Sequence, residues 1–329
     1  MTNETASGSM TLGDRIHRLE LDMEWKPHHV CAYLVEGDEP VLVDAGVPGD
    51  DGEADVERAL DAHGYGFEDI AHVLVTHPHI DHVGAIPAIL DATDPTVHAP
   101  AGTKAYYDLE GREEVGREHA RLVGFEGGML DSAVDEWLDG LQRNHDCLPP
   151  GEIDRVIGDG DEVTVGPLDI EAIHTPGHQA QHLCYVVEGP EETRMFSGDM
   201  LIGSFRSVIY QVGFGAGMFD AVDDYYGAFE RLRGRDVDRV YPGHGSVFTH
   251  YEDAIDGGVE SLDELVDEVA EILDDAGEAT ALDVTLERFQ DPDLIQHAIF
   301  DTVGALGHLD ATGRATSRIE DDARLFEPS

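Results

Sequence analysis

The segment THPHIDH, residues 76–82, gathers residue types that bind metal ions. His77, His79 and His82 supply three imidazoles and Asp81 supplies a carboxylate, directly after the apolar run IAHVLVT. In a loop that opens from a rigid strand, such side chains can converge on one or two cations. A histidine-rich surface turn is the alternative interpretation, and we favour metal binding.

Three more candidate ligands follow later apolar runs, each in a short turn that contains glycine. They are His178 in HTPGHQ, Asp199 in FSGD and His244 in YPGHG. Glycine allows a sharp turn that brings the neighbouring side chain inward. Taken singly, each has an ordinary alternative: a supporting or surface histidine, a turn or helix cap, and a loop histidine, respectively. Their common setting after strands favours one shared site.

The first part of the chain reads as short strands with a helix behind them. HRLELDM, HVCAYLVE and PVLVDAG, within residues 15–46, predict strands at the edge of a sheet. We expect a helix over residues 51–63, capped by Asp51 and closed by Gly64. The strand IAHVLVT then runs directly into the histidine cluster.

Strands and helices alternate in the later part as well. LDIEAIHT, HLCYVV, TRMFSGD and DRVYPGHG read as strands, with a helix near residues 220–233. This alternation predicts a layered α/β domain. Residues 101–148, between the first histidine cluster and the later candidates, are mostly helical by pattern, so we expect an insertion that roofs the site.

The pattern changes near residue 253, where helical periodicity begins to dominate and continues to the short polar segment DATGRATSR. We therefore place a catalytic domain at residues 1–252 and a small, mainly helical domain at residues 253–329.

Five motifs together resemble the pattern of the metallo-β-lactamase superfamily: VDAG with Asp44 and Gly46, HPHIDH, TPGH, SGD and PGHG, covering about residues 15–250. The resemblance implies an α/β fold, an αββα sandwich with metals held at one edge of the two sheets. The tail resembles the winged-helix-like end of β-lactamase-like hydrolases that include endoribonucleases. Its alternative, which we favour, is a helical cap that only completes a wall of the groove.

The resemblance also assigns roles to the candidate ligands. One metal would be bound by His77, His79 and His178. The second would be bound by Asp81, His82 and His244, and Asp199 would bridge both, which suits a carboxylate with two oxygens.

Three further residues are expected to support these ligands. Asp44 resembles the structural aspartate of the family, which orients a ligand, and a plain turn aspartate is its alternative. His174 and His182 flank His178, and we interpret them as supporting or strand residues rather than ligands.

This ligand set implies two divalent metal ions, with zinc favoured and iron or manganese also suited. A bridging water shared by two cations loses a proton near neutral pH, while one cation polarises the substrate oxygen. Asp81 and Asp199 are the expected catalytic residues, holding the hydroxide and moving its proton to the leaving group.

Ligand identity narrows the reaction. His79 stands where the flavodiiron-like pattern has glutamate, and Asp199 stands where many true β-lactamases have cysteine or serine, so both of those functions are disfavoured. We expect hydrolysis of a small ester, thioester or lactone. The alternatives are an endoribonuclease of the β-lactamase-like branch, an iron-dependent persulfide dioxygenase and a non-catalytic binding module. Phe205, Arg206 and Tyr210 lie where substrate loops occur, although packing explains them equally well.

The charge balance is extreme, with 70 acidic against 20 basic residues and a net charge of −50. Because the acids are spread along the chain rather than gathered in a tail, we interpret the protein as salt-adapted. Residues 256–329 carry 20 acids against four arginines, which disfavours nucleic acid as a partner.

The remaining expectations concern location and assembly. Cys31, Cys147 and Cys184 form no CxxC pair and predict reduced thiols. The start of the chain lacks the pattern of a signal peptide, and no apolar run reaches about 18 residues, so we expect a cytoplasmic protein without a membrane partner. Its expected partner is a small-molecule substrate, and a homodimer is left open.

Overall fold

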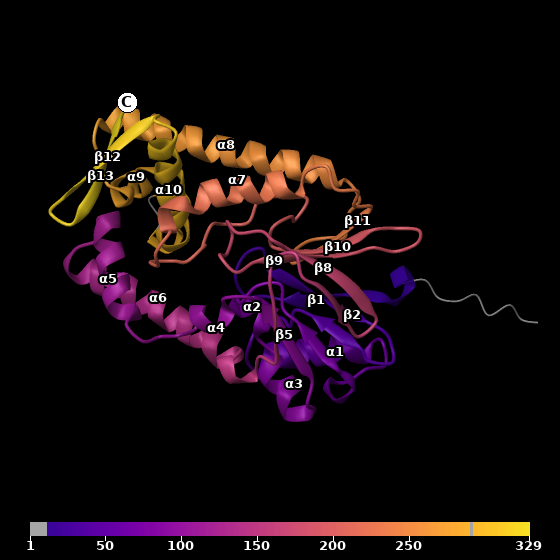
Figure 1. Cartoon of the computed structure of the whole chain (residues 1–329). Coiled ribbons are helices and arrows are strands. Elements are labelled where there is room, and N and C mark those ends of the chain that lie inside the picture. Colours follow the sequence, from indigo (N-terminus) through magenta and orange to yellow (C-terminus); the bar gives the residue numbers. More distant parts are fainter. Residues whose placement is uncertain (1–11, 290–291) are drawn as a thin grey trace, which may run out of the picture.

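The computed structural model describes residues 12–289 and 292–329, and in them two β-sheets lie face to face between layers of helices (Figure 1). The first sheet has six strands, β1 to β6 in chain order: Ile16–Asp22, His29–Val35, Val41–Val43, His72–Leu74, Thr96–Pro100 and Arg155–Ile157. The second sheet has five strands in the spatial order β11-β10-β9-β8-β7. In chain order, β7 to β11 are Glu162–Val165, Leu168–His174, Leu183–Val187, Arg194–Gly198 and Arg239–Pro242.

The two sheets share one apolar interior. Tyr33 and Val43 of the first sheet and Tyr185 and Phe196 of the second are all buried in the same cluster. Such burial of one face of each sheet against the other is the main reason that the layers stay together.

Helices cover the outer face of each sheet. α1 (Asp50–Asp61), α2 (Ile80–Val83) and α3 (Ile86–Ala92) lie against the first sheet, where Leu60 and Ile89 share a core with strand residues. α7 (Ala221–Leu232) and α8 (Tyr251–Ala276) cover the second sheet through Phe229 and Ile255. The expected αββα sandwich is confirmed.

Residues 101–148 form three helices: α4 (Thr103–Tyr106), α5 (Arg112–Val123) and α6 (Gly127–Cys147). The last part of the chain contains α9 (Ala281–Arg288), α10 (Pro292–Ala311) and a hairpin of β12 (Ala315–Glu320) and β13 (Ala323–Pro328). Short 3₁₀ helices occur at Leu12–Arg15, Phe67–Asp69, Pro150–Glu152 and Met218–Asp220.

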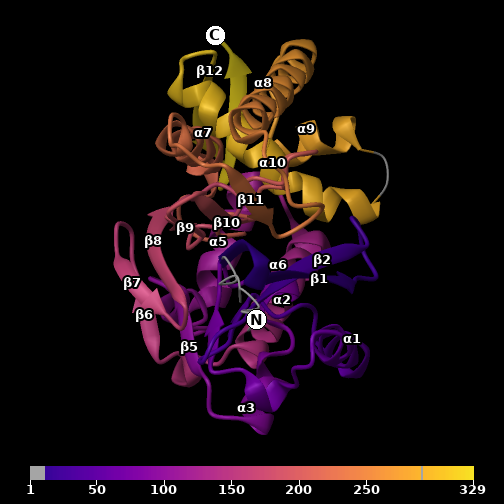
Figure 2. The same cartoon turned by 90° about the vertical axis from the view of Figure 1, so that its right-hand side faces the viewer.

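The C-terminal elements and the insertion pack on each other and on the outer helices of the second sheet. Figures 1 and 2 show α8 running alongside α7 and the β12–β13 hairpin at the far end of the molecule. Val123 of α5, Phe229 of α7, Val303 of α10 and Phe326 of β13 belong to one apolar cluster. Residue 253 lies within the first turn of α8, which is continuous from Tyr251.

Two local expectations are wrong. The first helix begins at Asp50, and its N-cap is Gly49, whose φ of 93° turns the chain, so Asp51 lies inside the first turn and caps nothing. There its charge favours the helix N-terminus without a capping hydrogen bond. The segment DATGRATSR is not merely a polar end, because Ala315 and the residues after it pair with β13.

In the described residues, every helix is too short or too polar to cross a lipid bilayer.

Candidate metal centre

Parallel strand pairs bring the motifs to one edge of the sandwich. β3 pairs in parallel with β4, in the register Val43 to Leu74, so the residues that follow these strands lie side by side. β10 and β11 are also parallel, with Gly198 opposite Pro242. The carboxyl ends of these four strands therefore present Asp44, the histidine cluster, Asp199 and His244 together.

The first expected ligand group is assembled in the structure. The Nε2 atom of His178 lies 3.2 Å from Nε2 of His77 and 2.9 Å from Nδ1 of His79. These three nitrogen atoms form one of the groups whose spacing suits a metal ion.

The second expected group is assembled beside it. The Nε2 atom of His244 lies 3.5 Å from Oδ2 of Asp81, and Nε2 of His82 lies 3.8 Å from the same oxygen. Asp81, His82 and His244 have the spacing of a second possible metal site.

Asp199 lies between the two groups. Its Oδ2 atom is 3.5 Å from Nε2 of His178 and 3.2 Å from Nε2 of His244, and its Oδ1 atom is 3.4 Å from Nε2 of His82. One carboxylate therefore faces ligands of both groups, as the bridging role requires. Gly243 makes this approach possible, because a Cβ atom there would lie 2.2 Å from Oδ1 of Asp199.

Four of the imidazoles are held by a contact at Nδ1, which leaves Nε2 directed into the centre. Nδ1 of His77 lies 3.0 Å from Oγ1 of Thr76, and Nδ1 of His82 lies 2.8 Å from Oδ2 of Asp44. Nδ1 of His178 lies 2.7 Å from the Val208 carbonyl, and Nδ1 of His244 lies 2.7 Å from the His29 carbonyl. Partners of this kind fix the tautomer and ring orientation of metal-binding histidines.

Asp44 supports two segments at once. Besides its contact with His82, its carboxylate accepts hydrogen bonds from the backbone N–H and the hydroxyl of Thr76, both at 2.8 Å. Its backbone φ of 57° is left-handed, a conformation that aspartate tolerates better than most residues. The buried carboxylate of Asp44 therefore contacts both Thr76 and Nδ1 of His82.

His182 and His174 lie outside the ligand groups. Nε2 of His182 accepts the backbone N–H of Asp199 at 3.1 Å, and its Nδ1 contacts the Thr175 hydroxyl at 2.8 Å. His174 ends β8 and lies 2.7 Å from the Ala180 carbonyl, within the turn that carries His178. Both residues contact the loops that carry the candidate ligands.

The donor set fits divalent cations. Nε2 of His82 and Oδ1 of Asp199 are buried and make no hydrogen bond in the described residues. Burial lowers the pKa of His77, His79 and His178, which keeps these imidazoles neutral and able to coordinate. Imidazole and carboxylate ligands together suit zinc, iron or manganese.

The carboxylates dominate the charge of the second group. Burial alone would lower the pKa of His82 and His244, yet neighbouring Asp199 and Asp81 raise the pKa of His244 to about 9 and that of His82 well above its usual value. Burial would raise the pKa of Asp199, but His244 and His82 hold it well below its usual value. The centre thus attracts positive charge, which is what metal cations supply.

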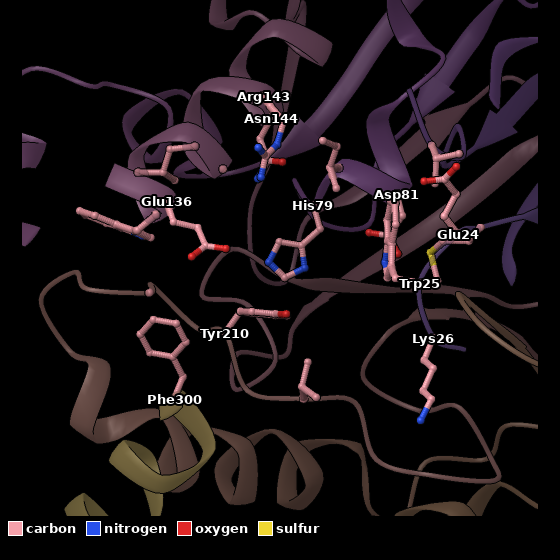
Figure 3. Close-up of a pocket in the computed structure, with 18 of the residues that line it drawn as sticks. Glu24, Trp25, Lys26, His79, Asp81, Glu136, Arg143, Asn144, Tyr210 and Phe300 are labelled. Carbon is pink, nitrogen blue, oxygen red and sulfur yellow. The ribbon is translucent and has the colours of Figure 1, made fainter. Parts of the chain in front are cut away.

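A cavity of about 2320 Å³ opens onto the centre and reaches His79, Asp81, His178, Asp199 and His244. Figure 3 shows His79 and Asp81 in its middle, with Glu136, Tyr210 and Phe300 on one side and Trp25 and Lys26 on the other. α6, which belongs to the segment 101–148, forms part of the wall of this cavity.

Phe205, Arg206 and Tyr210 all line this cavity. The Tyr210 ring lies 5.5 Å from the His79 ring, and burial raises the pKa of Tyr210, which keeps its hydroxyl protonated. Arg206 forms an ion pair with Asp301.

Sequence reasoning missed several lining residues, among them Trp25, Trp137, Arg143 and Phe300. No local motif marks them, because they come from a loop and from helices whose inward face depends on packing.

This fold, with His and Asp motifs at one edge of two facing sheets, is that of the metallo-β-lactamases. The chain belongs to the metallo-beta-lactamase superfamily, whose family model matches residues 25–244. The resemblance drawn from the sequence motifs is confirmed.

Three curated relatives give the range of similarity. A beta-lactamase-like protein 2 homolog of Caenorhabditis elegans is 25% identical over 222 residues, which cover 68% of this chain and 58% of that protein. The atrochrysone carboxyl ACP thioesterase dmxR1 of Cryptosporiopsis sp. is 24% identical over 188 residues, covering 57% and 41%. The protein named "Probable metallo-hydrolase YqjP" of Bacillus subtilis is 25% identical over 309 residues, covering 91% and 93%.

The chain spans between 41% and 60% of the length of the first three curated relatives.

Two solved structures share the fold over nearly the whole chain. A metallo-beta-lactamase family protein of Thermus thermophilus matches with a TM-score of 0.79 and 20% identity, covering 95% of this chain and 98% of that one. A beta-lactamase domain protein of Burkholderia ambifaria matches with a TM-score of 0.77 and 18% identity, covering 99% and 97%.

Proposed function

We propose that this protein is a dinuclear metal-dependent hydrolase that cleaves an ester, thioester or lactone. The observation that carries the proposal is the position of Asp199, whose Oδ2 atom lies 3.5 Å from Nε2 of His178 and 3.2 Å from Nε2 of His244. A carboxylate between two ligand groups is the arrangement that a pair of cations needs.

In this proposal His77, His79 and His178 would hold one cation, Asp81, His82 and His244 would hold the other, and Asp199 lies where its carboxylate would serve both. When bound, two such cations would lower the pKa of a water molecule and would polarise a carbonyl oxygen of the substrate. Asp81 and Asp199 orient the attacking water and carry its proton toward the leaving group. Asp44 and His182 keep His82 and Asp199 in place, and Tyr210 borders the position of the substrate.

The ester or thioester class is supported from two sides. Aspartate at position 199 differs from the cysteine or serine expected in many true β-lactamases. A relative with 24% identity is named as an ACP thioesterase. Its name is consistent with thioester hydrolysis by a protein of similar sequence.

A ribonuclease activity is the second candidate, and the charge distribution disfavours it. The four arginines of residues 256–329 are Arg288, Arg314, Arg318 and Arg324, and each of them pairs with a carboxylate. Phosphate binding needs basic side chains that are available to the backbone of the nucleic acid. We therefore expect neither RNA binding nor RNA cleavage.

The test combines metal content with hydrolysis. Purified protein is assayed in about 1 M KCl, where acidic surfaces are screened, against acyl thioesters, a lactone, single-stranded RNA and a persulfide. We expect close to two metal ions per chain by mass spectrometry, and thioester or lactone hydrolysis that a chelator abolishes.

Asp199→Asn removes the bridging charge with little change in shape and should lower kcat by at least about a hundredfold, as expected for loss of a main electrostatic contact. Asp91→Asn, an exposed change on α3, is the control that should leave hydrolysis intact. Less than about one metal ion per chain, together with unchanged hydrolysis in Asp199→Asn, would refute the dinuclear mechanism. Turnover of only RNA or only persulfide would replace it with the corresponding alternative.

A further inference from the structure

The cavity extends from the metal-ligand groups in two directions. Toward one side it is bordered by Glu136, Tyr210 and Phe300, and toward the other by Trp25 and Lys26 of the loop between β1 and β2 (Figure 3). We call the first direction the aromatic arm and the second the loop arm. The ligand groups lie between the two arms, where the bond that breaks would be placed.

The aromatic arm begins at the centre itself. Its rings contact one another in sequence, with centroid separations of 5.5 Å for His79 and Tyr210, 6.4 Å for Tyr210 and Phe300, 5.1 Å for Phe300 and Phe214, and 6.1 Å for Phe214 and Trp137. These separations are typical of packed aromatic pairs. A continuous apolar wall therefore leads from a metal ligand to α6.

This wall is built by three segments that are distant in the sequence. Trp137 comes from α6, Tyr210 and Phe214 come from the loop after β10, and Phe300 comes from α10. The C-terminal helix α10 thereby contributes one wall of the cavity.

Exposed apolar side chains gather along the same cavity. In the described residues, seven large apolar side chains are exposed, and four of them line it: Trp25, Met129, Phe205 and Val208, at 46%, 53%, 46% and 38%. On a surface with a net charge of −50, such a concentration marks a binding surface for an apolar ligand.

The loop arm has a different chemistry. Glu24 and Lys26 are exposed at its wall, and Asp50 and Asp51 at the start of α1 lie close by on the same cavity. Lys26 makes no ion pair or hydrogen bond in the described residues, although acids outnumber bases by 70 to 20 in this chain. Beside the exposed indole of Trp25, this arm therefore carries charged side chains that suit the polar portion of a substrate.

We propose that the preferred substrate is a thioester or ester of a bulky apolar acyl group, which lies in the aromatic arm while the polar alcohol or thiol portion lies in the loop arm. This inference rests on the proposed hydrolase function and adds the substrate class. Water adds its oxygen to the acyl carbon, the carbon–sulfur or carbon–oxygen bond breaks, and the leaving thiol or alcohol takes up a proton. The products are the carboxylic acid and the free thiol or alcohol.

The size of the cavity supports a large acyl group. Its volume of about 2320 Å³ exceeds the roughly 300–1,000 Å³ of common small-molecule sites. A short acyl group such as acetyl would leave most of the aromatic arm in contact with water.

The experiment uses the metal-loaded full chain and N-acetylcysteamine thioesters of acetate, butanoate, hexanoate and octanoate. Burial of each added methylene should raise kcat/KM by about fourfold until the arm is filled. A flat or falling dependence on chain length overturns the inference, while loss of all thioester hydrolysis in Asp199→Asn separately tests the hydrolase function.

Ala133→Trp places a large side chain in the arm, because Ala133 lines the cavity on α6. The octanoyl-to-acetyl ratio of kcat/KM should fall by at least about tenfold, which corresponds to the loss of about two buried methylenes at about fourfold each. Asp135→Trp is the matched control: it adds the same side chain to an exposed position of α6 that does not line the cavity, and the ratio should stay as in the wild type. Equal ratios in all three proteins overturn the inference.

Binding of the carboxylate products tests the aromatic arm as an acyl site even if no thioester is hydrolysed. By calorimetry, octanoate should bind at least about tenfold more tightly than butanoate, because both carry the same carboxylate and differ in apolar length. Ala133→Trp should abolish the difference, and Asp135→Trp should retain it. Equal affinities for octanoate and butanoate in the wild-type protein contradict the aromatic arm as an acyl site.

Discussion

The carboxylate of Asp301 on α10 lies 3.3 Å from Nη2 of Arg206, and both side chains are mostly buried. The same carboxylate accepts the backbone N–H of Ile209 at 2.8 Å. Between these two contacts lies Val208, whose carbonyl lies 2.7 Å from Nδ1 of His178. A helix near the end of the chain is therefore linked to a candidate metal ligand through one short loop.

Asp301→Asn should lower the free energy of unfolding by about 3–5 kcal/mol, because it leaves the buried Arg206 guanidinium uncompensated. Asparagine still accepts the hydrogen bond from Ile209, so the charge alone is tested. The measurement is urea denaturation of chelator-treated protein, in which bound metal contributes nothing. Arg206→Met combined with Asp301→Asn should recover most of the loss, and a single variant within about 0.5 kcal/mol of the wild type would contradict the role of the pair.

Asp44→Asn should reduce metal retention and kcat by about 10- to 100-fold, as found when partners of metal-binding histidines are removed. Asparagine tolerates the left-handed backbone at this position, so the change removes the charge that orients His82 while keeping the fold. Metal content after dialysis and the melting temperature distinguish the two effects. A variant that loses its fold, or one that keeps full metal content and activity, would contradict this interpretation.

Stability should fall between about pH 6.5 and pH 4 because of His98. Burial, then neighbouring His72 and Arg155, lowers the pKa of His98 to about 4 in the folded chain. The unfolded chain takes up this proton near its ordinary pKa of about 6.5, so within this window the unfolded state binds more protons and stability falls as the pH falls.

His98→Gln should remove part of that pH dependence, roughly 2–3 kcal/mol after allowance for partial exposure to solvent. Denaturation of chelator-treated wild type and variant at several pH values provides the measurement. Equal slopes for the two proteins between these pH limits would show that His98 does not titrate in this way.

We propose that the protein is salt-adapted, and its stability should accordingly rise with ionic strength. With a net charge of −50, repulsion among acids is screened as the Debye length shortens from about 10 Å at 0.1 M to about 3 Å at 1 M salt. Sodium and potassium chloride should act alike, because screening depends on ionic strength. A melting temperature that stays flat or falls across this range would contradict the salt-adapted interpretation.

The grouping of the candidate ligands and of Asp44 at one edge of the sandwich could be predicted from the sequence because the information is local. Asp44, His77, Asp199 and His244 each follow a short apolar run, and strand ends that are parallel meet at one edge. Side-chain type and position relative to a strand were therefore sufficient to bring these residues together.

The cavity and the hairpin could not be predicted in the same way. Which face of α6 or α10 points inward depends on packing against segments far away in the sequence, so Trp137 and Phe300 carried no signal. Most residues of β12 are exposed, and its pairing with β13 depends on Ala315 and Phe326 being buried against distant helices. Hydrophobic periodicity in a sequence arises from burial of one face of an element, so the signal is weak where a hairpin lies on the surface.

Because α8 continues past residue 252, the tail cannot be exchanged by recombination at this position without cutting a helix. A cut or a recombination joint within this helix would remove the part of α8 around Gly258 that packs on Phe229 and would leave α7 alone over the second sheet. The same joint would take away Phe300 and with it one wall of the cavity at the candidate metal centre. Exchange of the tail between relatives should therefore change substrate range and cooperativity of unfolding together, as a single inherited unit.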